Sequence, residues 1–223
     1  MRAPVTSEAH LREEVCRVGR SLHERGYVHA TAGNISLRLD DGFLITPTDA
    51  CLGTLTPARL ARVDLQGQQT DGDRASKTLA LHRQIYAADA QARCIIHSHS
   101  THLVALTLQG VWSADDIVPP ITPYFVMKVG HVPLIPYHRP GDPRVAALVA
   151  ARIQTMAERG TPLRAVMLDR LGPVVWQQSP GEASAVLEEL EETARLWLLC
   201  KPAPAALTEQ QIDELRRQFG AIW

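Results

Sequence analysis

The chain has 223 residues, of which 45% are hydrophobic and 21% are charged, and its formal net charge at pH 7 is −1. This length suits one α/β domain with one core, and this composition excludes a disordered chain. Because basic and acidic residues are nearly balanced, no positive field would attract a nucleic acid or an anionic membrane, so neither is expected as a partner. We therefore expect residues 1–223 to form a single domain.

The cysteines are scattered, without a C-x-x-C pair, which predicts free thiols in a reducing compartment. They are Cys16, Cys51, Cys94 and Cys200. The sequence has no run of about 18 apolar residues and no apolar run after a basic N-terminal segment, so it predicts neither a membrane span nor a signal peptide. The expected localisation is the cytoplasm.

The first elements are a helix and a hairpin. Apolar residues recur three and four positions apart over residues 7–26, where Ser7 is a candidate N-cap, and this spacing predicts an amphipathic helix. Residues 31–39 and 41–48 read as two short strands. The Asp-Gly dipeptide between them is typical of a hairpin turn.

The middle of the chain alternates strands and helices. Residues 56–64 predict a helical turn followed by a strand, and 66–73 predict a polar turn. Residues 75–90 predict a core helix, 93–96 a short strand and 103–110 an apolar helix. A polar turn between a strand and a helix, as between 93–96 and 103–110, is a common place for chemistry in α/β proteins.

The last part begins with the proline-rich segment 117–140, where proline confines strand-like pieces to edges or ends. Residues 142–159 predict a helix, and 164–176 predict a two-strand hairpin around a Leu-Gly-Pro turn. A long helix is expected over 180–200 and a short one over 208–219. No repeat interrupts this pattern, which agrees with a single domain.

The strongest chemical signal is a pair of histidines, His97 and His99, directly after the strand 93–96. Side chains two positions apart in an extended segment point to one face, so the pair could present two imidazoles to one metal ion. A catalytic zinc normally takes three protein ligands, so a further histidine or carboxylate is required. The alternative is a polar surface turn, and His102 could be either a ligand or a packing residue.

Three short stretches could bind an anion. Gly33 and Asn34 lie in a loop of small and hydroxyl residues that could form a backbone-lined cradle, and Thr46 could add a hydroxyl group. Ser76 and Lys77 stand at the entry to a helix, where free N–H groups and an ammonium group favour a phosphate or a carboxylate. Each stretch also has an ordinary reading as a turn or a helix cap.

Together, in this order, these stretches resemble the class II aldolase/adducin superfamily over most of residues 8–200. The segments most similar to its branch of 3-oxo-tetronate 4-phosphate decarboxylases are 46–64, 98–106, 122–142 and 187–199. The resemblance implies an α/β/α sandwich around a mostly antiparallel sheet. It also implies a homotetramer with sites between subunits.

The resemblance assigns roles to individual residues. Residues that match Gly33, Asn34, Thr46, Ser76 and Lys77 line the phosphate end of the family's site. Residues that match His97 and His99 bind a divalent metal, which we expect to be zinc, with manganese as the alternative.

The chain departs from the family's pattern at two positions. The acid/base glutamate expected four residues before His82 is Thr78, and the third histidine ligand, expected in an Asn-His-Gly-Pro hairpin, is Leu171. Asp169 could substitute as a carboxylate ligand. His131 and His138 occupy positions near the family's active site where an arginine and an aromatic residue are expected. These departures are typical of a degenerate or rebuilt catalytic centre.

The resemblance implies a metal-dependent decarboxylase (a carbon-carbon lyase) acting on a 3-oxo-tetronate 4-phosphate-like sugar acid phosphate, with a degenerate centre. Decarboxylation needs a proton donor for the enediolate but no base to remove a hydroxyl proton, so it tolerates the loss of the glutamate better than aldol cleavage. Thr78 with a water, or Tyr124, is the expected donor. The alternatives are a sugar-phosphate aldolase or epimerase, a Schiff-base role for Lys77, or a noncatalytic interaction protein like the adducin head.

Overall fold

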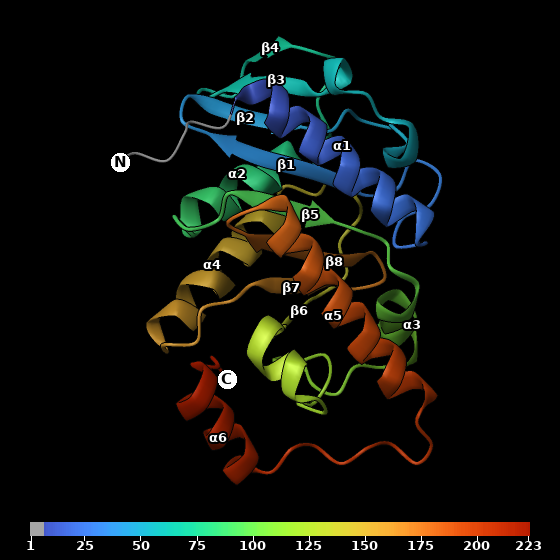
Figure 1. Cartoon of the computed structure of the whole chain (residues 1–223), viewed down its shortest axis with the longest axis vertical. Coiled ribbons are helices and arrows are strands. Elements are labelled where there is room, and N and C mark those ends of the chain that lie inside the picture. Colours follow the sequence, from blue (N-terminus) through green and yellow to red (C-terminus); the bar gives the residue numbers. More distant parts are fainter. Residues whose placement is uncertain (1–6) are drawn as a thin grey trace.

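The computed structural model describes residues 7–223, which form an eight-stranded sheet with helices on both faces (Figure 1). The strand order is β4-β3-β2-β1-β5-β8-β7-β6, and every neighbouring pair is antiparallel except β6 with β7. The strands are β1 (Asn34–Leu39), β2 (Gly42–Ile45), β3 (Ala61–Asp64), β4 (Gln69–Asp71), β5 (Cys94–His97), β6 (Leu134–Ile135), β7 (Ala165–Leu168) and β8 (Gly172–Gln177). The predicted mostly antiparallel sheet is confirmed.

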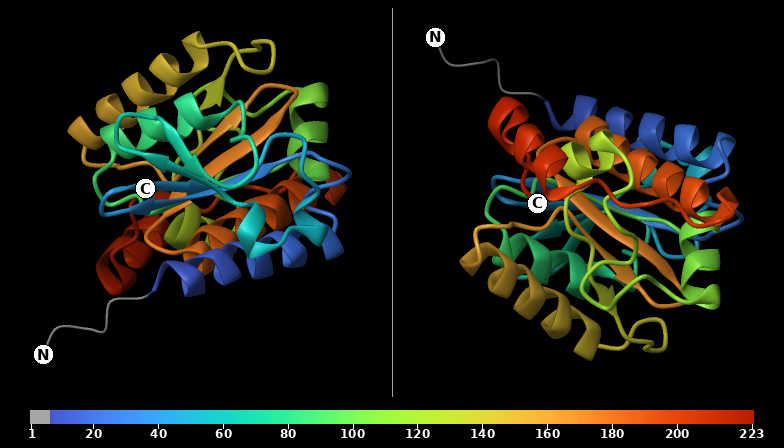
Figure 2. Two further views of the ribbon diagram at one scale, coloured as in Figure 1. Left: turned by 90° about the horizontal axis from the view of Figure 1, so that it is seen from above. Right: turned by 90° about the horizontal axis from the view of Figure 1, so that it is seen from below.

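The helices make two outer layers. Figure 2 shows α1 and α5 on one side of the sheet and α2 and α4 on the other. The helices are α1 (Glu8–Glu24), α2 (Leu79–Ala88), α3 (Thr101–Gln109), α4 (Arg144–Glu158), α5 (Pro180–Leu199) and α6 (Glu209–Phe219). A π-helical turn, Phe125–Val129, lies in the proline-rich segment. The predicted α/β/α sandwich is therefore confirmed.

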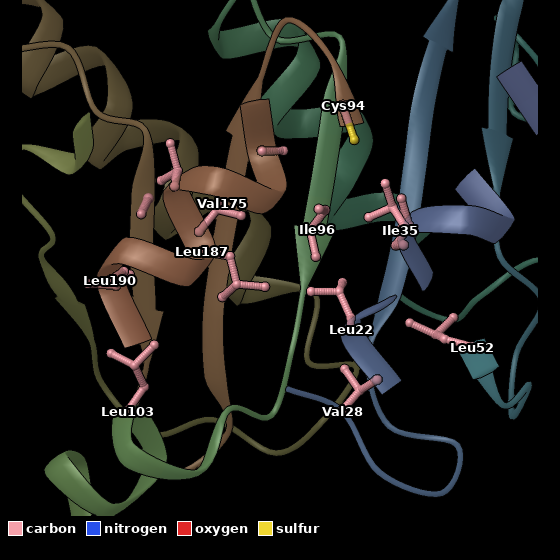
Figure 3. Packing of buried hydrophobic residues seen from close by; sticks show 14 of the residues in the cluster. Leu22, Val28, Ile35, Leu52, Cys94, Ile96, Leu103, Val175, Leu187 and Leu190 are labelled. Carbon is pink, nitrogen blue, oxygen red and sulfur yellow. The ribbon is translucent and has the colours of Figure 1, made fainter. Parts of the chain in front are cut away.

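Alternation along the central strand β5 divides the core between the two faces of the sheet. Ile96 belongs to the larger apolar cluster, together with Leu22 of α1 and Leu187 of α5 (Figure 3). Ile95 belongs to the second cluster, which includes Ile85 of α2. Successive side chains of a strand point to opposite faces, so His97 shares the face of Ile95, beneath α2 and α4.

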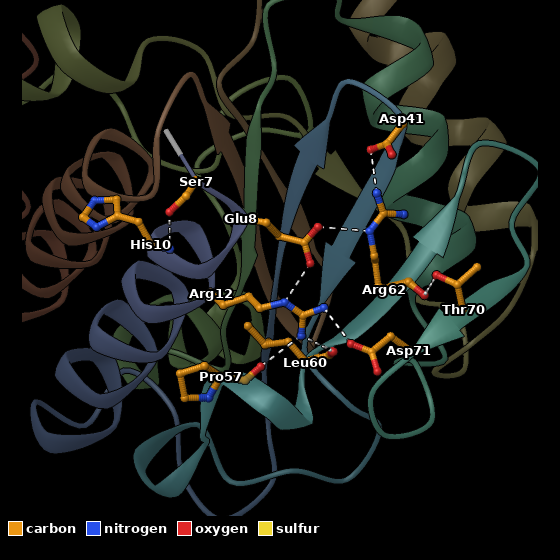
Figure 4. A network of polar contacts seen from close by, with 10 residues as sticks. All are labelled: Ser7, Glu8, His10, Arg12, Asp41, Pro57, Leu60, Arg62, Thr70 and Asp71. Atoms are coloured by element: carbon orange, nitrogen blue, oxygen red, sulfur yellow. Dashed lines mark hydrogen bonds and ion pairs between the residues drawn. The ribbon is translucent and has the colours of Figure 1, made fainter. Parts of the chain in front are cut away.

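The sheet edge is fastened to α1 by a polar network around Arg12 (Figure 4). The Arg12 guanidinium donates to the carbonyl oxygens of Pro57 and Leu60 at 3.1 and 3.0 Å and to the Asp71 carboxylate at 3.1 Å. Asp71 belongs to β4, so the polar turn predicted for residues 66–73 is wrong in part. All residues of β4 are exposed, and a strand without a buried face has no apolar alternation to reveal it.

The helix boundaries follow local capping. The predicted cap of α1 is confirmed, since the Ser7 hydroxyl accepts from the backbone N–H of His10 at 3.3 Å. The second helix begins at Leu79 rather than at residue 75. Ala75 instead forms an antiparallel bridge with Pro47, and the N–H of Ser76 donates to the carbonyl oxygen of Thr46. Residues 75–78 are therefore held against the end of β2, outside the helix.

The predicted free thiols are found in the structure. All the cysteines are free, and Cys16 and Cys94 are buried. Within residues 7–223, none of the helices combines the length and the apolar character needed to cross a lipid bilayer.

Candidate active site

The predicted anion-binding residues converge where β1, β5 and the segment before α2 meet. Asn34 lies opposite His97 in the β1–β5 pairing. The Thr78 hydroxyl donates to the side-chain oxygen of Asn34 at 3.0 Å, and the Ser76 hydroxyl lies 3.0 Å from that of Thr78. Because the Thr78 proton is used on Asn34, Ser76 donates to Thr78. The two hydroxyl groups of Ser76 and Thr78 thus form a hydrogen-bonded hydroxyl chain that ends on the side-chain amide of Asn34, opposite His97.

Gly33 and Thr46 fix the position of β1 relative to its neighbouring strands at this site. Gly33 has a φ of +82°, and a Cβ there would lie 2.8 Å from the carbonyl oxygen of His97. Only glycine permits both this left-handed conformation and this close approach. The Thr46 hydroxyl accepts from the N–H of Ile35 at 3.1 Å, which connects β1 to the end of β2.

A pocket opens beside these residues, between the start of α2 and the start of α4. It is lined by Lys77, Thr78, His97 and Leu171, together with residues 136 and 138–143 of the loop before α4. Lys77 is exposed, and its ammonium nitrogen lies 3.8 Å from the exposed carboxylate of Asp49. An ion pair between exposed groups at this distance is weak, so the ammonium group remains available to an anion.

His97 has the protonation state of a metal ligand. Its Nδ1 lies 2.8 Å from the carbonyl oxygen of Pro173, which can only accept, so Nδ1 carries the proton and Nε2 keeps its lone pair. Burial, followed by the neighbouring His99, lowers the pKa of His97 to about 4. The ring is therefore neutral at pH 7, with a free nitrogen.

The geometry of the histidine pair, His97 and His99, also fits one ion. Their ring centres are 5.0 Å apart. Two imidazoles that bind one tetrahedral ion through nitrogens at about 2.1 Å have ring centres roughly 5 Å apart. His99 is partly exposed, and burial followed by the charge of His29 lowers its pKa. The pair fits two ligands of a divalent metal.

Leu171, where the family resemblance leads us to expect a third histidine ligand, lies in the turn before β8. A Cβ on the adjacent Gly172 would lie 2.0 Å from the carbonyl oxygen of Ser98 and 3.2 Å from the Cα of His99, so this turn packs directly against the backbone of these two residues. Leu171 itself lines both the pocket beside His97 and an open hollow beside His99. Asp169 lines the pocket as well, yet residues 7–223 contain no group of three His, Cys, Asp or Glu side chains placed to hold a metal. The histidine pair fits a metal, and no third side chain of the described chain completes the site.

Two residues of this region were not predicted from the sequence. The His29 ring centre lies 6.3 Å from that of His99. Arg170 lines the open hollow that His29 and His99 also line. His29 comes from the loop before β1 and Arg170 from the turn before β8, far apart in sequence. No local pattern marks either residue.

The remaining predicted candidates lie elsewhere or have other partners. Tyr124 is 62% exposed at the start of the π-helical turn and is not among the residues that line the pocket or the hollow. His131 stacks on Trp223 at 4.4 Å and bonds to Asp116 at 2.8 Å. His102 bonds to Glu191 at 2.8 Å beside the N-terminus of α3, which favours its structural reading. His138 lines the pocket.

A buried histidine near the site makes stability depend on pH. His82 is fully buried with its Nδ1 2.7 Å from the Ser36 hydroxyl, and burial, then His97, lowers its pKa to about 3. The unfolded chain, with a pKa of about 6.5, binds the proton first as the pH falls. The stabilisation is therefore complete above pH 6.5 and is lost between pH 6.5 and about 3.

We expect wild type to lose about 2 kcal/mol more unfolding free energy between pH 7 and pH 5 than His82→Gln, measured by urea denaturation. His10→Ala removes an exposed histidine and serves as the control that keeps the wild-type slope. Equal slopes for wild type and His82→Gln would contradict this assignment.

Comparison with known proteins places the chain among class II aldolases. The profile of the family described as Class II Aldolase and Adducin N-terminal domain matches residues 13–198. A 3-oxo-tetronate 4-phosphate decarboxylase of Cupriavidus necator is 57% identical over 98% of this chain and 100% of its own length. The protein of that name from Escherichia coli K12 is 43% identical over 94% of this chain and 96% of its own length.

Solved structures agree with these sequence comparisons. YgbL of Klebsiella pneumoniae superposes with a TM-score of 0.86 at 44% identity, covering 95% of this chain and all of that one. An L-fuculose 1-phosphate aldolase superposes with a TM-score of 0.78 at 21% identity, covering 97% of this chain and 98% of that one, a likeness that concerns the fold alone.

Proposed function

Because the chain belongs to the Class II Aldolase and Adducin N-terminal domain family, we propose that it is a lyase that decarboxylates a 3-oxo-tetronate 4-phosphate-like sugar acid phosphate. The observation that carries the proposal is that Lys77, Thr78 and His97 line one pocket, while Thr78 is bonded to Asn34 and His99 lies beside His97. A relative of that name shares 57% of its residues over nearly the whole chain.

The phosphate end of the substrate would meet Lys77 and the Ser76 hydroxyl, with Gly33 and Asn34 beneath. Lys77 provides an ammonium group without a strong partner, and Ser76 precedes it directly before α2. Fixing the phosphate would place the 3-oxo acid toward His97, which lines the same pocket. Such positioning is itself a large part of catalysis.

Loss of carbon dioxide from a 3-oxo acid leaves negative charge on the former carbonyl oxygen. A divalent metal bound by His97 and His99 would supply Lewis-acid stabilisation of this charge, and two imidazole donors favour zinc, with manganese as the alternative. Apolar side chains such as Leu81, Leu168 and Leu171 line the pocket and would keep water from the developing charge.

A proton must then reach the enediolate carbon. Thr78 is within the pocket, and with a water it remains our proposed donor, although its own proton is used on Asn34. Tyr124 lies away from the pocket and is exposed, so its proposed role as donor requires a site on a second subunit. This requirement and the family resemblance support our proposal of a homotetramer. The free thiols support our proposal of a cytoplasmic location.

The direct test is release of carbon dioxide from a 3-oxo-tetronate 4-phosphate by protein purified without an affinity tag. Turnover well above the spontaneous rate is expected, and L-fuculose 1-phosphate should remain uncleaved. Cleavage of that phosphate instead would identify an aldolase. Absence of turnover on either compound at any added zinc or manganese concentration would favour the noncatalytic alternative.

Lys77→Gln should raise KM about 10- to 100-fold, because a charge-assisted bond to phosphate contributes about 1.5–3 kcal/mol. The value of kcat should change much less, since the lysine contacts a part of the substrate that does not react. Lys201→Gln, an exposed lysine after α5, is the matched control. An unchanged KM in Lys77→Gln would remove Lys77 from the phosphate site.

A further inference from the structure

The histidine pair has fewer protein donors than a permanently bound metal needs. Catalytic zinc sites normally hold their ion with three protein ligands and leave a fourth position open. Here two imidazoles are suitably placed, and among the described residues no third histidine, cysteine or carboxylate is positioned with them to hold an ion. At least two coordination positions are therefore left to groups from outside the chain.

Leu171 lies beside the histidine pair and has no atom that can bind a metal. It lines the pocket beside His97 and the hollow beside His99, so it stands next to both ligands. It also packs on the apolar cluster beneath α2 and α4. A hydrocarbon side chain held in this way gives the ion no lone pair, and the turn that carries it is pressed against Ser98 and His99.

The surrounding charges disfavour a free cation and favour an anion. Arg170 lines the hollow beside His99, and Lys77 and Arg139 line the pocket beside His97. Of the acidic side chains in the pocket, Asp142 is bound by Arg144 at 2.7 Å, which leaves Asp169. A dication that enters alone meets an excess of positive charge, whereas one that enters with a multiply charged anion does not.

We propose that the histidine pair binds its divalent cation only together with an anionic substrate, whose oxygens occupy the positions that Leu171 leaves without a protein ligand. This inference rests on the proposed decarboxylase function. A carboxylate and an adjacent oxygen of a sugar acid can chelate one ion, and carboxylate oxygens are established zinc ligands. Because binding linkage is reciprocal, the metal must raise the affinity for the sugar acid by the same factor.

The test is titration of the full chain with Mn²⁺, followed by electron paramagnetic resonance of the free ion, with and without a tetronate 4-phosphate. This compound carries a hydroxyl group in place of the 3-oxo group, so it cannot lose carbon dioxide. For wild type we expect Mn²⁺ affinity to rise at least 10-fold when the analogue is saturating. His97→Ala should show neither basal nor analogue-dependent binding.

Leu171→His is the decisive variant, since it adds an imidazole beside the pair. In the absence of the analogue, this variant should bind Mn²⁺ at least 10-fold more tightly than wild type does. Adding the analogue should then increase its Mn²⁺ affinity by a smaller factor than in wild type. Leu171→Phe introduces a ring of similar size without a donor and should behave as wild type.

The outcomes separate this inference from the proposed function. Tight metal binding by wild type without the analogue would overturn the inference and leave the decarboxylase proposal intact. Analogue binding, measured by calorimetry, that leaves the Mn²⁺ affinity unchanged would do the same. Absence of analogue binding at any Mn²⁺ concentration would contradict both.

Discussion

Replacing His97 with alanine is expected to lower kcat/KM for decarboxylation about 10²- to 10³-fold, the usual cost of losing a group that stabilises developing charge. His97 lines the pocket, and its Nε2 is the unprotonated nitrogen because Nδ1 donates to Pro173. Its neutral state at pH 7, with a pKa lowered to about 4, keeps that nitrogen available. The measurement is the initial rate of carbon dioxide release under saturating metal.

His97 is buried, so the variant must be shown to fold. His97→Gln retains much of the side-chain volume and should lose activity with a smaller loss of unfolding free energy than His97→Ala. His10→Ala changes an exposed histidine of α1 and should leave kcat/KM at the wild-type value. Full activity in a folded His97→Gln protein would exclude the histidine pair from the reaction.

Gly172→Ala is expected to destabilise the protein by about 2–4 kcal/mol, because it combines backbone strain with a steric clash. Gly172 has a φ of +136°, and its Cβ would lie 2.0 Å from the carbonyl oxygen of Ser98. The turn would have to move away from the histidine pair, so metal binding should weaken as well. Chemical denaturation measures the first effect and Mn²⁺ titration the second.

Gly181→Ala is the matched control for this substitution. Gly181 lies in α5 with no atom within 4 Å of an added Cβ, so alanine should stabilise the protein by about 0.5 kcal/mol. The two variants make the same chemical change and should shift the unfolding free energy in opposite directions. A destabilisation below about 0.5 kcal/mol in Gly172→Ala would show that the turn can relax without cost.

Elements with a buried face were predictable because their pattern is local. The apolar spacing of residues 7–26 predicted α1, and the two-residue period at the end of β5 predicted that His97 and His99 are neighbours. By contrast, β4 is exposed on all its residues, and the start of α2 was displaced by a bridge to Pro47. Both depend on a partner strand that no local window contains.

The sequence by itself determined the family, the pair of histidines and the chemical identity of the side chains at positions 78 and 171. A leucine cannot bind a metal in any fold, so the departure at Leu171 was visible without coordinates. Only the tertiary structure decided that Leu171 lines both the pocket beside His97 and the hollow beside His99, and that Arg170 and His29 line that hollow as well. These relations arise from contacts between segments far apart in the chain, which sequence periodicity does not encode.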